Sequence, residues 1–544
     1  MKIKVLPPKS KTPLAGNPSF ILVQDNWNDF GFKTQYDLHY LSDDGCEFIG
    51  AVKILKAGQT SGDGLLLDGD FQSLGQDYCS IGQSLDYYER LAGLPRDFRD
   101  YLLRSINDVV FYPEISKKFS SEVGWKTSLF RDFQENDEFI LLARSLLSRD
   151  YTSLPAEDLA FSFSLPDWTK PLSLDFTPPS APLHRGGRKV QELPSRMAVI
   201  IGRNGSGKST LLARFARIAH ASLKDRRRKS LKRVGEIVPD GIGFPRIITV
   251  SYSAFDSFQL PGVNPEEREQ IIKDVQNGEG RFYYVGLRDI VGELSEDLSR
   301  NKILNDDPIV SSTDDRMKSN ILKSLDVMAE EFCRNVRQIY ASDRDDLLGL
   351  SLRKLSRESS IADIWDDYCE FGFEDDGLHE KFMSWSTGHK ISLHLITSLV
   401  AYCIPRSIVL IDEPETHLHP PLLAALMHAI RLILRRTKSF AIVATHSPVV
   451  VQETMAKHVH VVSRVGSVTD IRPASIETFG ENVGAITSEI FGLHVESTDY
   501  HDVLLKLAIK FKSLEVIESL FGFGLSLQAR AYVMSLLVDN SADN

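Results

Sequence analysis

The chain has 544 residues, of which 42% are hydrophobic and 25% charged, and its formal net charge is −11. This composition is typical of a globular protein with a buried core, and the acidic balance excludes a generally basic surface for nucleic acid. The apolar runs are far shorter than the roughly 20 residues of a membrane span. The five cysteines are scattered. We therefore expect a cytoplasmic protein with no membrane partner and no disulfide framework.

The first half of the chain has the pattern of a β lobe followed by helices. Aromatic and β-branched residues predict strands over residues 19–25, 34–41 and 47–55. The periodicity becomes helical between residues 84 and 148. The proline-rich stretch 165–189 suits neither a helix interior nor a central strand, so we predict a connector there. Residues 1–255 would form the first half of the main domain.

The second half predicts a parallel sheet with a helical insertion. A strand at residues 246–255 is followed by charged, helix-patterned sequence, and we predict a helical insertion at 256–380. The apolar segments SIVLIDE and SFAIVATH flank a helix, and this strand–helix–strand spacing predicts a parallel α/β sheet. Residues 381–472 would complete the domain, and residues 473–544 would form a helical C-terminal tail.

The segment GRNGSGKS has the spacing of a phosphate-binding loop, Gly-x-x-x-x-Gly-Lys-Ser. It follows an apolar strand and opens an amphipathic helix, so its backbone N–H groups and the helix N-terminus would hold phosphates. Lys208 would neutralise the β- and γ-phosphates, and Ser209 would bind Mg²⁺. The bland alternative is a glycine-rich turn with a solvated lysine. The predicted nucleotide-binding residues are Gly202, Arg203, Asn204, Gly205, Ser206, Gly207, Lys208, Ser209 and Thr210.

An acidic strand end supplies the second half of such a site. Asp412 and Glu413 follow four apolar residues and would reach the carboxyl edge of the sheet, where parallel sheets bind ligands. Asp412 would hold Mg²⁺ together with Ser209, and Glu413 would orient and deprotonate the attacking water. His446 ends the next strand and would contact the γ-phosphate. An ordinary strand-to-helix turn is the alternative for His446.

The order of these motifs resembles that of the ABC-type ATPase heads. The turn WSTGHK resembles the signature turn of that family, with Ser386 and Gly388 at the best-matching positions. Thr387 and His389 stand where the family has glycine and glutamine. In the family this turn caps the γ-phosphate held by a second subunit, so the resemblance implies a homodimer or higher homo-oligomer that encloses ATP and Mg²⁺. It also implies an ABC-type head, with a P-loop sheet and an antiparallel β lobe.

Within that family, DEPETHLHP and ATHSPVVV resemble the OLD-like branch, although we recognise neither a Toprim nor an HNH nuclease motif. Longer stretches such as NDFGFKTQYDL resemble PtuA, the ATPase of Septu and retron-associated Septu systems. The resemblance implies anti-phage defence, a separate PtuB-like HNH nuclease and, in a retron, a reverse transcriptase with an RNA–DNA hybrid (msDNA). ATP turnover would be slow or partner-regulated.

Two other functions fit the same motifs. One is a nucleotide-gated scaffold with negligible hydrolysis, which the departures at Thr387 and His389 favour. The other is a DNA-repair ATPase of the RecF or SMC-like kind. The basic run Arg226–Arg233 is a candidate nucleic-acid contact, with a solvated helix face as the alternative.

The remaining candidates are single residues. Trp27 or Phe30 would stack on adenine unless they belong to the core of the β lobe. Gln259 is a candidate Q-loop residue after the predicted strand that ends at Phe255. His417 and His419 form a His-x-His pair, for which we weigh a metal site against a capping or interface role.

Overall fold

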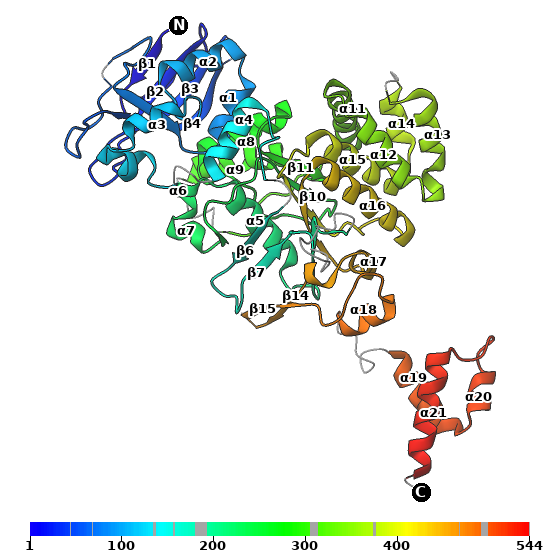
Figure 1. Ribbon diagram of the computed structural model, residues 1–544. Coiled ribbons are helices and arrows are strands. Elements are labelled where there is room, and N and C mark those ends of the chain that lie inside the picture. Colours follow the sequence, from blue (N-terminus) through cyan, green and yellow to red (C-terminus); the bar gives the residue numbers. More distant parts are fainter. Residues whose placement is uncertain are drawn as a thin grey trace, which may run out of the picture. The chain divides into compact units, whose positions relative to one another are not determined.

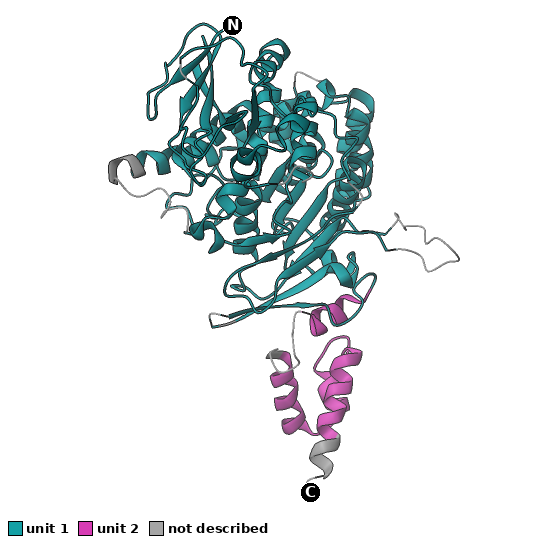
Figure 2. Cartoon of the chain, turned by 60° about the vertical axis from the view of Figure 1, so that its left-hand side comes forward, with its two compact units in different colours: residues 1–480 teal, residues 481–544 magenta. Residues whose placement is uncertain are grey.

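The structure of the protein is a computed structural model. It describes residues 1–43, 45–67, 69–133, 138–155, 158–179, 193–304, 314–373, 377–466, 468–490 and 499–542. The chain divides into two compact units, Met1–Gly480 and Glu481–Asn544, coloured separately in Figure 2. Each unit is described by itself.

A seven-stranded sheet organises the first unit (Figure 1). Its order is β11-β10-β12-β13-β8-β14-β15, and all pairings are parallel except the last. The strands are β8 (Met197–Ile201), β10 (Ile247–Ser251), β11 (Phe282–Gly286), β12 (Ile408–Asp412), β13 (Phe440–Thr445), β14 (Val459–Val465) and β15 (Val468–Pro473). The central strands are short runs of buried apolar residues, as a parallel sheet requires. The predicted α/β fold is confirmed.

Two long helices, α5 (Lys208–His220) and α15 (Thr387–Tyr402), position the site. α5 packs on β10, β12 and β13, and its predicted apolar face is buried in the core. α15 packs against α16 (Pro420–Thr437) and α11 (Leu325–Ala341). α17 (Pro448–Gln452) and the single turn η3 (Ala456–His458) connect β13 to β14. The phosphate loop and the Ser386 turn therefore each open a helix that is anchored in the core.

The N-terminal lobe has its own five-stranded sheet and core. Its strands are β1 (Ile3–Leu6), β2 (Ser19–Gln24), β3 (Gln35–Ser42), β4 (Gly45–Lys56) and β5 (Tyr78–Gly82). The helices are α1 (Leu85–Gly93), α2 (Arg96–Ser105), α3 (Glu114–Phe119), η1 (Trp125–Leu129) and α4 (Glu138–Ser148). The three predicted strands and the helical segment are confirmed. β1 and β5 were not anticipated, and β1 pairs parallel to β2 in an otherwise antiparallel sheet.

A small antiparallel sheet corrects the prediction for residues 165–189. It contains β6 (Ala160–Ser164), β7 (Leu172–Asp175) and β9 (Glu236–Val238). β7 lies inside the expected connector, because Leu172 and Leu174 alternate with exposed residues and enter the core. The prolines flank this edge strand rather than interrupt it. The part of the predicted connector beyond residue 179 lies outside the described residues.

The sequence predicts a helical insertion at 256–380, but this segment is not purely helical. It contains β11, whose five residues FYYVG are all buried at the end of the main sheet. Five residues are too few to interrupt the helical periodicity of the charged sequence around them. The helices of the segment are α8 (Pro265–Asn277), α9 (Ile290–Leu304), α11, α12 (Asp345–Leu355), η2 (Ser359–Ile361), α13 (Ala362–Phe371) and α14 (Leu378–Ser384).

The second unit is helical, as predicted for the C-terminal tail. It contains α18 (Val483–Glu489), α19 (Asp499–Phe511), α20 (Leu514–Ser519) and α21 (Leu527–Ala542). A small core centred on Leu504, Ala508, Ile517 and Val533 holds its helices together. Across the described parts of both units, none of the helices is both long and apolar enough to cross a bilayer.

Candidate nucleotide-binding site

The carboxyl ends of three neighbouring strands bring the predicted catalytic residues together. β13 lies between β8 and β12, and all three run parallel, so their ends meet at one edge of the sheet. The phosphate loop follows β8, Asp412 ends β12, and His446 follows β13. The hydroxyl of Ser209 donates to Oδ1 of Asp412 at 3.0 Å. The structure therefore joins the two predicted metal ligands directly.

The phosphate loop turns sharply between β8 and α5. Gly205 and Gly207 have φ angles of 80° and 94°, in the left-handed region that side chains disfavour. A Cβ atom on Gly202 would lie 2.2 Å from the carbonyl oxygen of Val462, so the adjacent strand excludes a larger residue. The hydroxyl of Ser206 is buried and has no hydrogen-bond partner among the described residues. A bound phosphate would satisfy it.

Lys208 is buried at the start of α5. Its Nζ donates to the carbonyl oxygens of Gly202 at 3.1 Å and Arg203 at 3.4 Å, and lies 2.6 Å from Nε2 of His446. Burial lowers the pKa of Lys208, although the Glu413 carboxylate opposes this. The pKa of His446 is lowered by burial and then by the charge of Lys208. A neutral imidazole therefore accepts from the ammonium, and a phosphate would compete for the same donors.

Asp412 carries an unusual carboxyl group. Burial, together with the charges of Glu413 and Asp256, raises its pKa to about 7, although the hydrogen bond from Ser209 opposes this shift. A bound divalent cation would offset this repulsion and favour the ionised form. Ser209 and Asp412 present oxygen atoms, which are the ligands that Mg²⁺ prefers. The residues present thus fit Mg²⁺ with a nucleotide supplying further oxygens.

Glu413 is placed to act on water. Its φ angle is 46°, and its backbone N–H donates to the carbonyl oxygen of Ala444 at 2.8 Å. The side chain is 38% exposed, and Oε1 lies 3.6 Å from Nε2 of His446. Because the carboxylate stays accessible, it can accept a proton from a water beside the phosphate loop.

Glu415 holds the histidine turn and was missed in the sequence. One carboxylate oxygen accepts from the backbone N–H of His446 at 2.6 Å, and the other accepts from the hydroxyl of Thr445 at 2.8 Å. Burial raises the pKa of Glu415. The signal available was its place two residues after Glu413, but its partners lie about 30 residues further along the chain. Glu415 therefore positions His446 without touching the reacting atoms.

A buried polar chain joins the end of β10 to two helices. The hydroxyl of Tyr252 lies 2.8 Å from Nδ1 of His394 on α15, whose Nε2 lies 3.4 Å from Glu331 on α11. Lys323 lies 2.8 Å from Glu331. Burial disfavours the carboxylate, yet the hydrogen bond from His394 and the charge of Lys323 lower the pKa of Glu331 to about 2. The helix that begins at the Ser386 turn is thus tied to the sheet beside Asp412.

The loop after β10 contributes Asp256 to the site. Its charge raises the pKa of Asp412, and it accepts hydrogen bonds from Arg288 at 3.3 Å and Tyr284 at 3.4 Å. Gln259, the candidate Q-loop residue, is 5% exposed, and its backbone N–H donates to the carbonyl oxygen of Asp315. Asp256 is therefore the residue of this loop whose charge acts on the predicted Mg²⁺ ligand.

The Ser386 turn starts α15, as predicted. Ser386 caps the helix by accepting a hydrogen bond from the backbone N–H of His389 at 3.3 Å. Ser386 and Thr387 are exposed, and Gly388 is half-buried. The ring of His389 lies 3.1 Å from the hydroxyl of Ser360. The turn thus presents the positive end of a 16-residue helix to the outside of the chain.

The histidine pair His417 and His419 lies just before α16. His419 is the N-cap residue of α16, and its charge lowers the pKa of His389 after the larger effect of burial. Throughout the described ranges, no group of three or more His, Cys, Asp or Glu side chains gathers to hold a metal ion. His419 occupies the N-cap position without a side-chain capping hydrogen bond to any described residue, and His417 lies two residues before it.

Trp27 and Phe30 lie away from the phosphate loop. Trp27 lines a cavity with His220 at the last turn of α5, and Nζ of Lys224 lies 3.9 Å from its ring centroid. α5 begins at the phosphate loop and rises about 1.5 Å per residue over 13 residues. Arg131 packs on the rings of both aromatic residues. Neither is therefore placed to stack on adenine.

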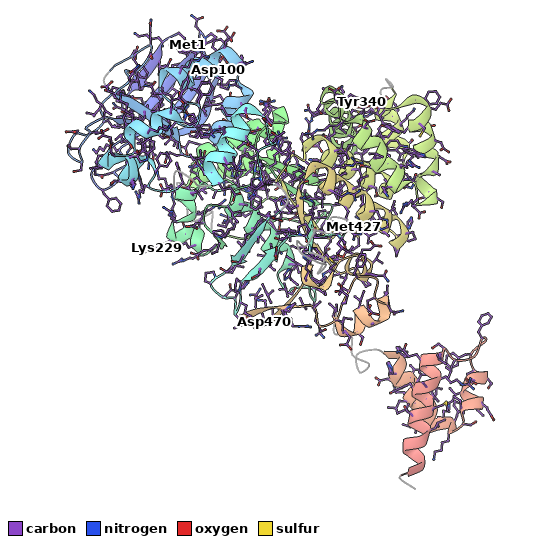
Figure 3. The ribbon with its side chains drawn as sticks, viewed as in Figure 1. Met1, Asp100, Lys229, Tyr340, Met427 and Asp470 are labelled. Carbon is purple, nitrogen blue, oxygen red and sulfur yellow. The ribbon has the colours of Figure 1, made fainter. Side chains whose placement is uncertain are left out.

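The basic run Arg226–Arg233 is largely engaged within the chain. Arg226 is 7% exposed and donates to four backbone carbonyl oxygens. Arg227 pairs with Asp132, Arg228 with Asp225, and Lys232 with Glu236. Lys229 is exposed on α7 (Lys229–Lys232), after the short α6 (Leu223–Arg226), as Figure 3 shows. Arg226 is thus structural, which corrects its place in the predicted nucleic-acid contact.

These elements define a class of protein. A parallel sheet with a glycine-rich phosphate loop, an acidic strand end and a histidine turn is the site of a P-loop ATPase. A family model described as "AAA domain, putative AbiEii toxin, Type IV TA system" matches residues 370–452, which include the Ser386 turn, Asp412 and His446.

Protein ea59 of Escherichia phage lambda is 30% identical over 544 residues, covering 95% of this chain and 94% of that protein. The chain belongs to the protein ea59 family. A solved structure of an SMC head bound to the C-winged helix domain of ScpA is 14% identical, with 59% of this chain and 98% of that chain covered. Its TM-score of 0.23 is too low to carry an argument.

Proposed function

We propose that the protein is an ATPase that dimerises around two ATP·Mg²⁺ and thereby controls a partner. The observation that carries this proposal is the convergence of Lys208, Asp412 and His446 at one edge of the parallel sheet. Such a cluster of a cation, a metal-ligand carboxylate and a histidine behind a glycine loop suits phosphoryl transfer to water.

Each residue has a distinct task in that reaction. Lys208 and the loop amides bind the phosphate oxygens, and Ser209 with Asp412 holds the metal ion, which neutralises phosphate charge when bound. Glu413 takes the proton of the attacking water, and Glu415 fixes the turn that carries His446. The second subunit would supply Ser386 and the N-terminus of α15 to the γ-phosphate.

The partner we propose is an HNH nuclease on a separate chain, acting in anti-phage defence. The resemblance to PtuA supports this, and in a retron system a reverse transcriptase with msDNA would join the assembly. Protein ea59 is itself phage-encoded, which fits a role in excluding competing phages.

A scaffold with negligible hydrolysis is the second candidate. The contact between Lys208 and Nε2 of His446 favours it, because in this arrangement Nε2 accepts a hydrogen bond and cannot donate one to a phosphate. ATP turnover well above that of a Lys208→Ala variant would rule out the scaffold.

The substitution Glu413→Gln tests the ATPase proposal. It should lower turnover by about a hundredfold or more, since a general base is lost, and leave ATP bound. Light scattering during gel filtration should then show a dimer with ATP·Mg²⁺ and a monomer with ADP. A variant that stays monomeric with ATP bound would overturn the dimer.

Co-purification tests the partner. A tagged chain expressed with its neighbouring genes should recover an HNH protein, identified by mass spectrometry with and without ATP. Recovery of repair or replication proteins instead would move the assignment to a RecF-like or SMC-like ATPase.

A further inference from the structure

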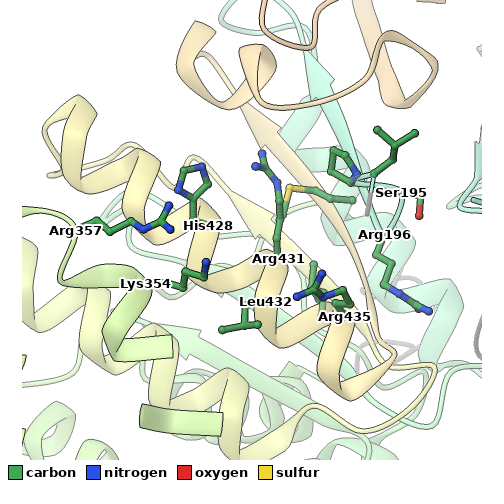
Figure 4. Close-up of a pocket in the computed structure, with 12 residues that line it drawn as sticks. Ser195, Arg196, Lys354, Arg357, His428, Arg431, Leu432 and Arg435 are labelled. Carbon is green, nitrogen blue, oxygen red and sulfur yellow. The ribbon is translucent and has the colours of Figure 1, made fainter. Parts of the chain in front are cut away.

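A cavity lies near the amino-terminal end of β8, whereas the phosphate loop follows the carboxyl end of this strand (Figure 4). Its volume is about 250 Å³, close to the small end of known ligand sites. Three segments form it: the residues before β8, the end of α12, and the second half of α16. β8 starts at the cavity and ends at the phosphate loop, and its five residues separate the two by about 13 Å.

The lining of this cavity is strongly cationic. Arginine or lysine side chains reach it from all three segments, and no carboxylate is among the lining residues. The cationic members are Arg196, Lys354, Arg357, Arg431 and Arg435. Figure 4 shows Lys354 and Arg357 extending toward His428 on α16. Like charges that line one cavity repel one another, and a bound anion would relieve that repulsion.

Part of this charge has an ordinary explanation. Lys354 and Arg435 lie in the last turns of α12 and α16, where basic residues stabilise the helix dipole. Arg196, which precedes a strand, places its guanidinium 5.1 Å from the centroid of the Phe440 ring, and Arg431, more than a turn before the end of α16, pairs with Glu453. Among the described residues, the lining nevertheless contains five cationic side chains and no carboxylate.

Arg431 supplies the second observation. Its side chain is only 17% exposed, and Nη1 lies 2.5 Å from Glu453, which also lies 3.1 Å from Nε2 of His428. Nε and Nη2 of Arg431 are buried with no hydrogen-bond partner within the part of the chain that the structure describes. Unpaired buried donors are costly, and a phosphate oxygen is the acceptor that a guanidinium matches best.

The rest of the wall is apolar and points to the body of the ligand. Leu193, Pro194, Met197, Leu432 and Leu434 line the cavity beside the cations. An inorganic ion would leave this surface in water, whereas a base or sugar would cover it. We propose that the cavity is a second ligand site that binds a nucleoside phosphate, either free or as the end of a nucleic-acid strand. This proposal does not depend on ATP hydrolysis at the phosphate loop.

A labelled strand end tests the site. The probe is a fluorescein-labelled five-nucleotide thymidylate with a 5′-phosphate, and its anisotropy is followed with the full chain at several salt concentrations. Binding that survives Lys208→Ala does not belong to the phosphate loop. Thymidine monophosphate and inorganic phosphate serve as competitors, the former representing a free nucleoside phosphate.

The informative variant is Lys354→Gln/Arg435→Gln, and its matched control is Arg353→Gln/Arg436→Gln. The control removes the same charge from the same helix ends, at exposed positions that do not line the cavity. We expect the first pair to weaken binding about tenfold or more and to reduce the slope of log K against log salt by about 1.4, because each lost phosphate contact removes about 0.7. The control pair should weaken binding less than about threefold.

Three results would overturn the proposal. The first is equal weakening of oligonucleotide binding by both variant pairs. The second is no binding of the oligonucleotide by the wild-type chain near 0.1 mM, since a dissociation constant of ~10⁻⁴ M is typical of non-specific contacts. The third is displacement of the oligonucleotide by inorganic phosphate and thymidine monophosphate at equal concentrations. Displacement by the nucleotide at lower concentration supports a free nucleoside phosphate. Binding that only the oligonucleotide achieves supports a strand end.

Discussion

The phosphate-loop half of the proposed ATP site is held by contacts within the chain, whereas the Ser386 half lies exposed at the start of α15. In the first half, Ser209 bonds to Asp412, Lys208 contacts His446, and Glu415 fixes the histidine turn. In the second half, Ser386 caps its own helix and Thr387 is exposed. A single chain thus preorganises the first half, and the proposed dimer would bring the second half from another molecule.

The two halves should therefore fail in different ways. Damage to the preorganised half removes nucleotide binding or chemistry from each chain separately. Damage to the exposed half leaves each chain able to bind nucleotide and prevents only the step that needs two chains. The following predictions use this contrast.

Lys208→Ala should have the largest effect. It removes the cation that faces the phosphates, so ATP turnover should fall by about a thousandfold or more and nucleotide binding should become undetectable. Turnover assays and equilibrium binding of labelled ATP would measure this. Lys208→Arg is the control for charge alone, and unimpaired ATP binding by Lys208→Ala would contradict the assigned loop.

Ser386→Arg should lower turnover by about a hundredfold while each chain still binds ATP, because an exposed helix start is blocked by a bulky cation. Mixing it with Lys208→Ala provides the sharper measurement. Half of the dimers then contain one intact pairing of loop and turn, so turnover should recover to about a quarter of the wild-type value. No recovery on mixing would argue that the turn acts within its own chain.

Glu415→Gln should have a smaller effect. The amide can still accept one of the two hydrogen bonds, but it holds the turn less firmly and carries no charge. We expect kcat to fall about tenfold to a hundredfold with KM changed less than about twofold, the pattern of a positioning residue. Thr445→Val removes the hydrogen bond that the Thr445 hydroxyl donates to Glu415, and it should show the same loss of kcat. A matching rise in KM would assign Glu415 to binding instead.

A change of pH should have a milder effect than these substitutions, and it should act on Mg²⁺ binding. Burial raises the pKa of Asp412 to about 7. Its proton must leave before Mg²⁺ binds, so Mg²⁺ affinity should fall about tenfold per pH unit below pH 7 and level off above it. The same raised pKa means that the folded state keeps a proton that the unfolded state releases near pH 4. The free energy of unfolding of the metal-free protein should therefore fall as the pH rises from about 4 to about 7. Calorimetry and thermal unfolding would measure both, and Asp412→Asn should abolish the pH dependence.

Contiguous motifs could be read from the sequence because neighbouring residues build them. The loop through Lys208, the acidic end at Asp412 and the capped turn at Ser386 all occupy their predicted elements. The local chemistry of glycines, a buried strand and an N-cap determines these shapes with little help from the rest of the chain.

Features that join distant segments could not be read in the same way. Tyr252 and His394 are 142 residues apart, and nothing in either local sequence indicates their contact. β11 is five buried residues within a charged, helix-rich segment. The Arg226–Arg233 run is conspicuous in the sequence, yet folding pairs most of it within the chain. Arg196 and Arg431, far apart in the sequence, line the same cavity.

The backbone at Glu413 has a consequence for the history and engineering of this family. A residue with a φ angle of 46° pays about 1 kcal/mol for its left-handed conformation, which glycine or asparagine would tolerate better. Selection for thermal robustness alone would therefore favour replacing the very carboxylate that takes the proton from water. Persistence of glutamate at this position would be a record of selection for turnover.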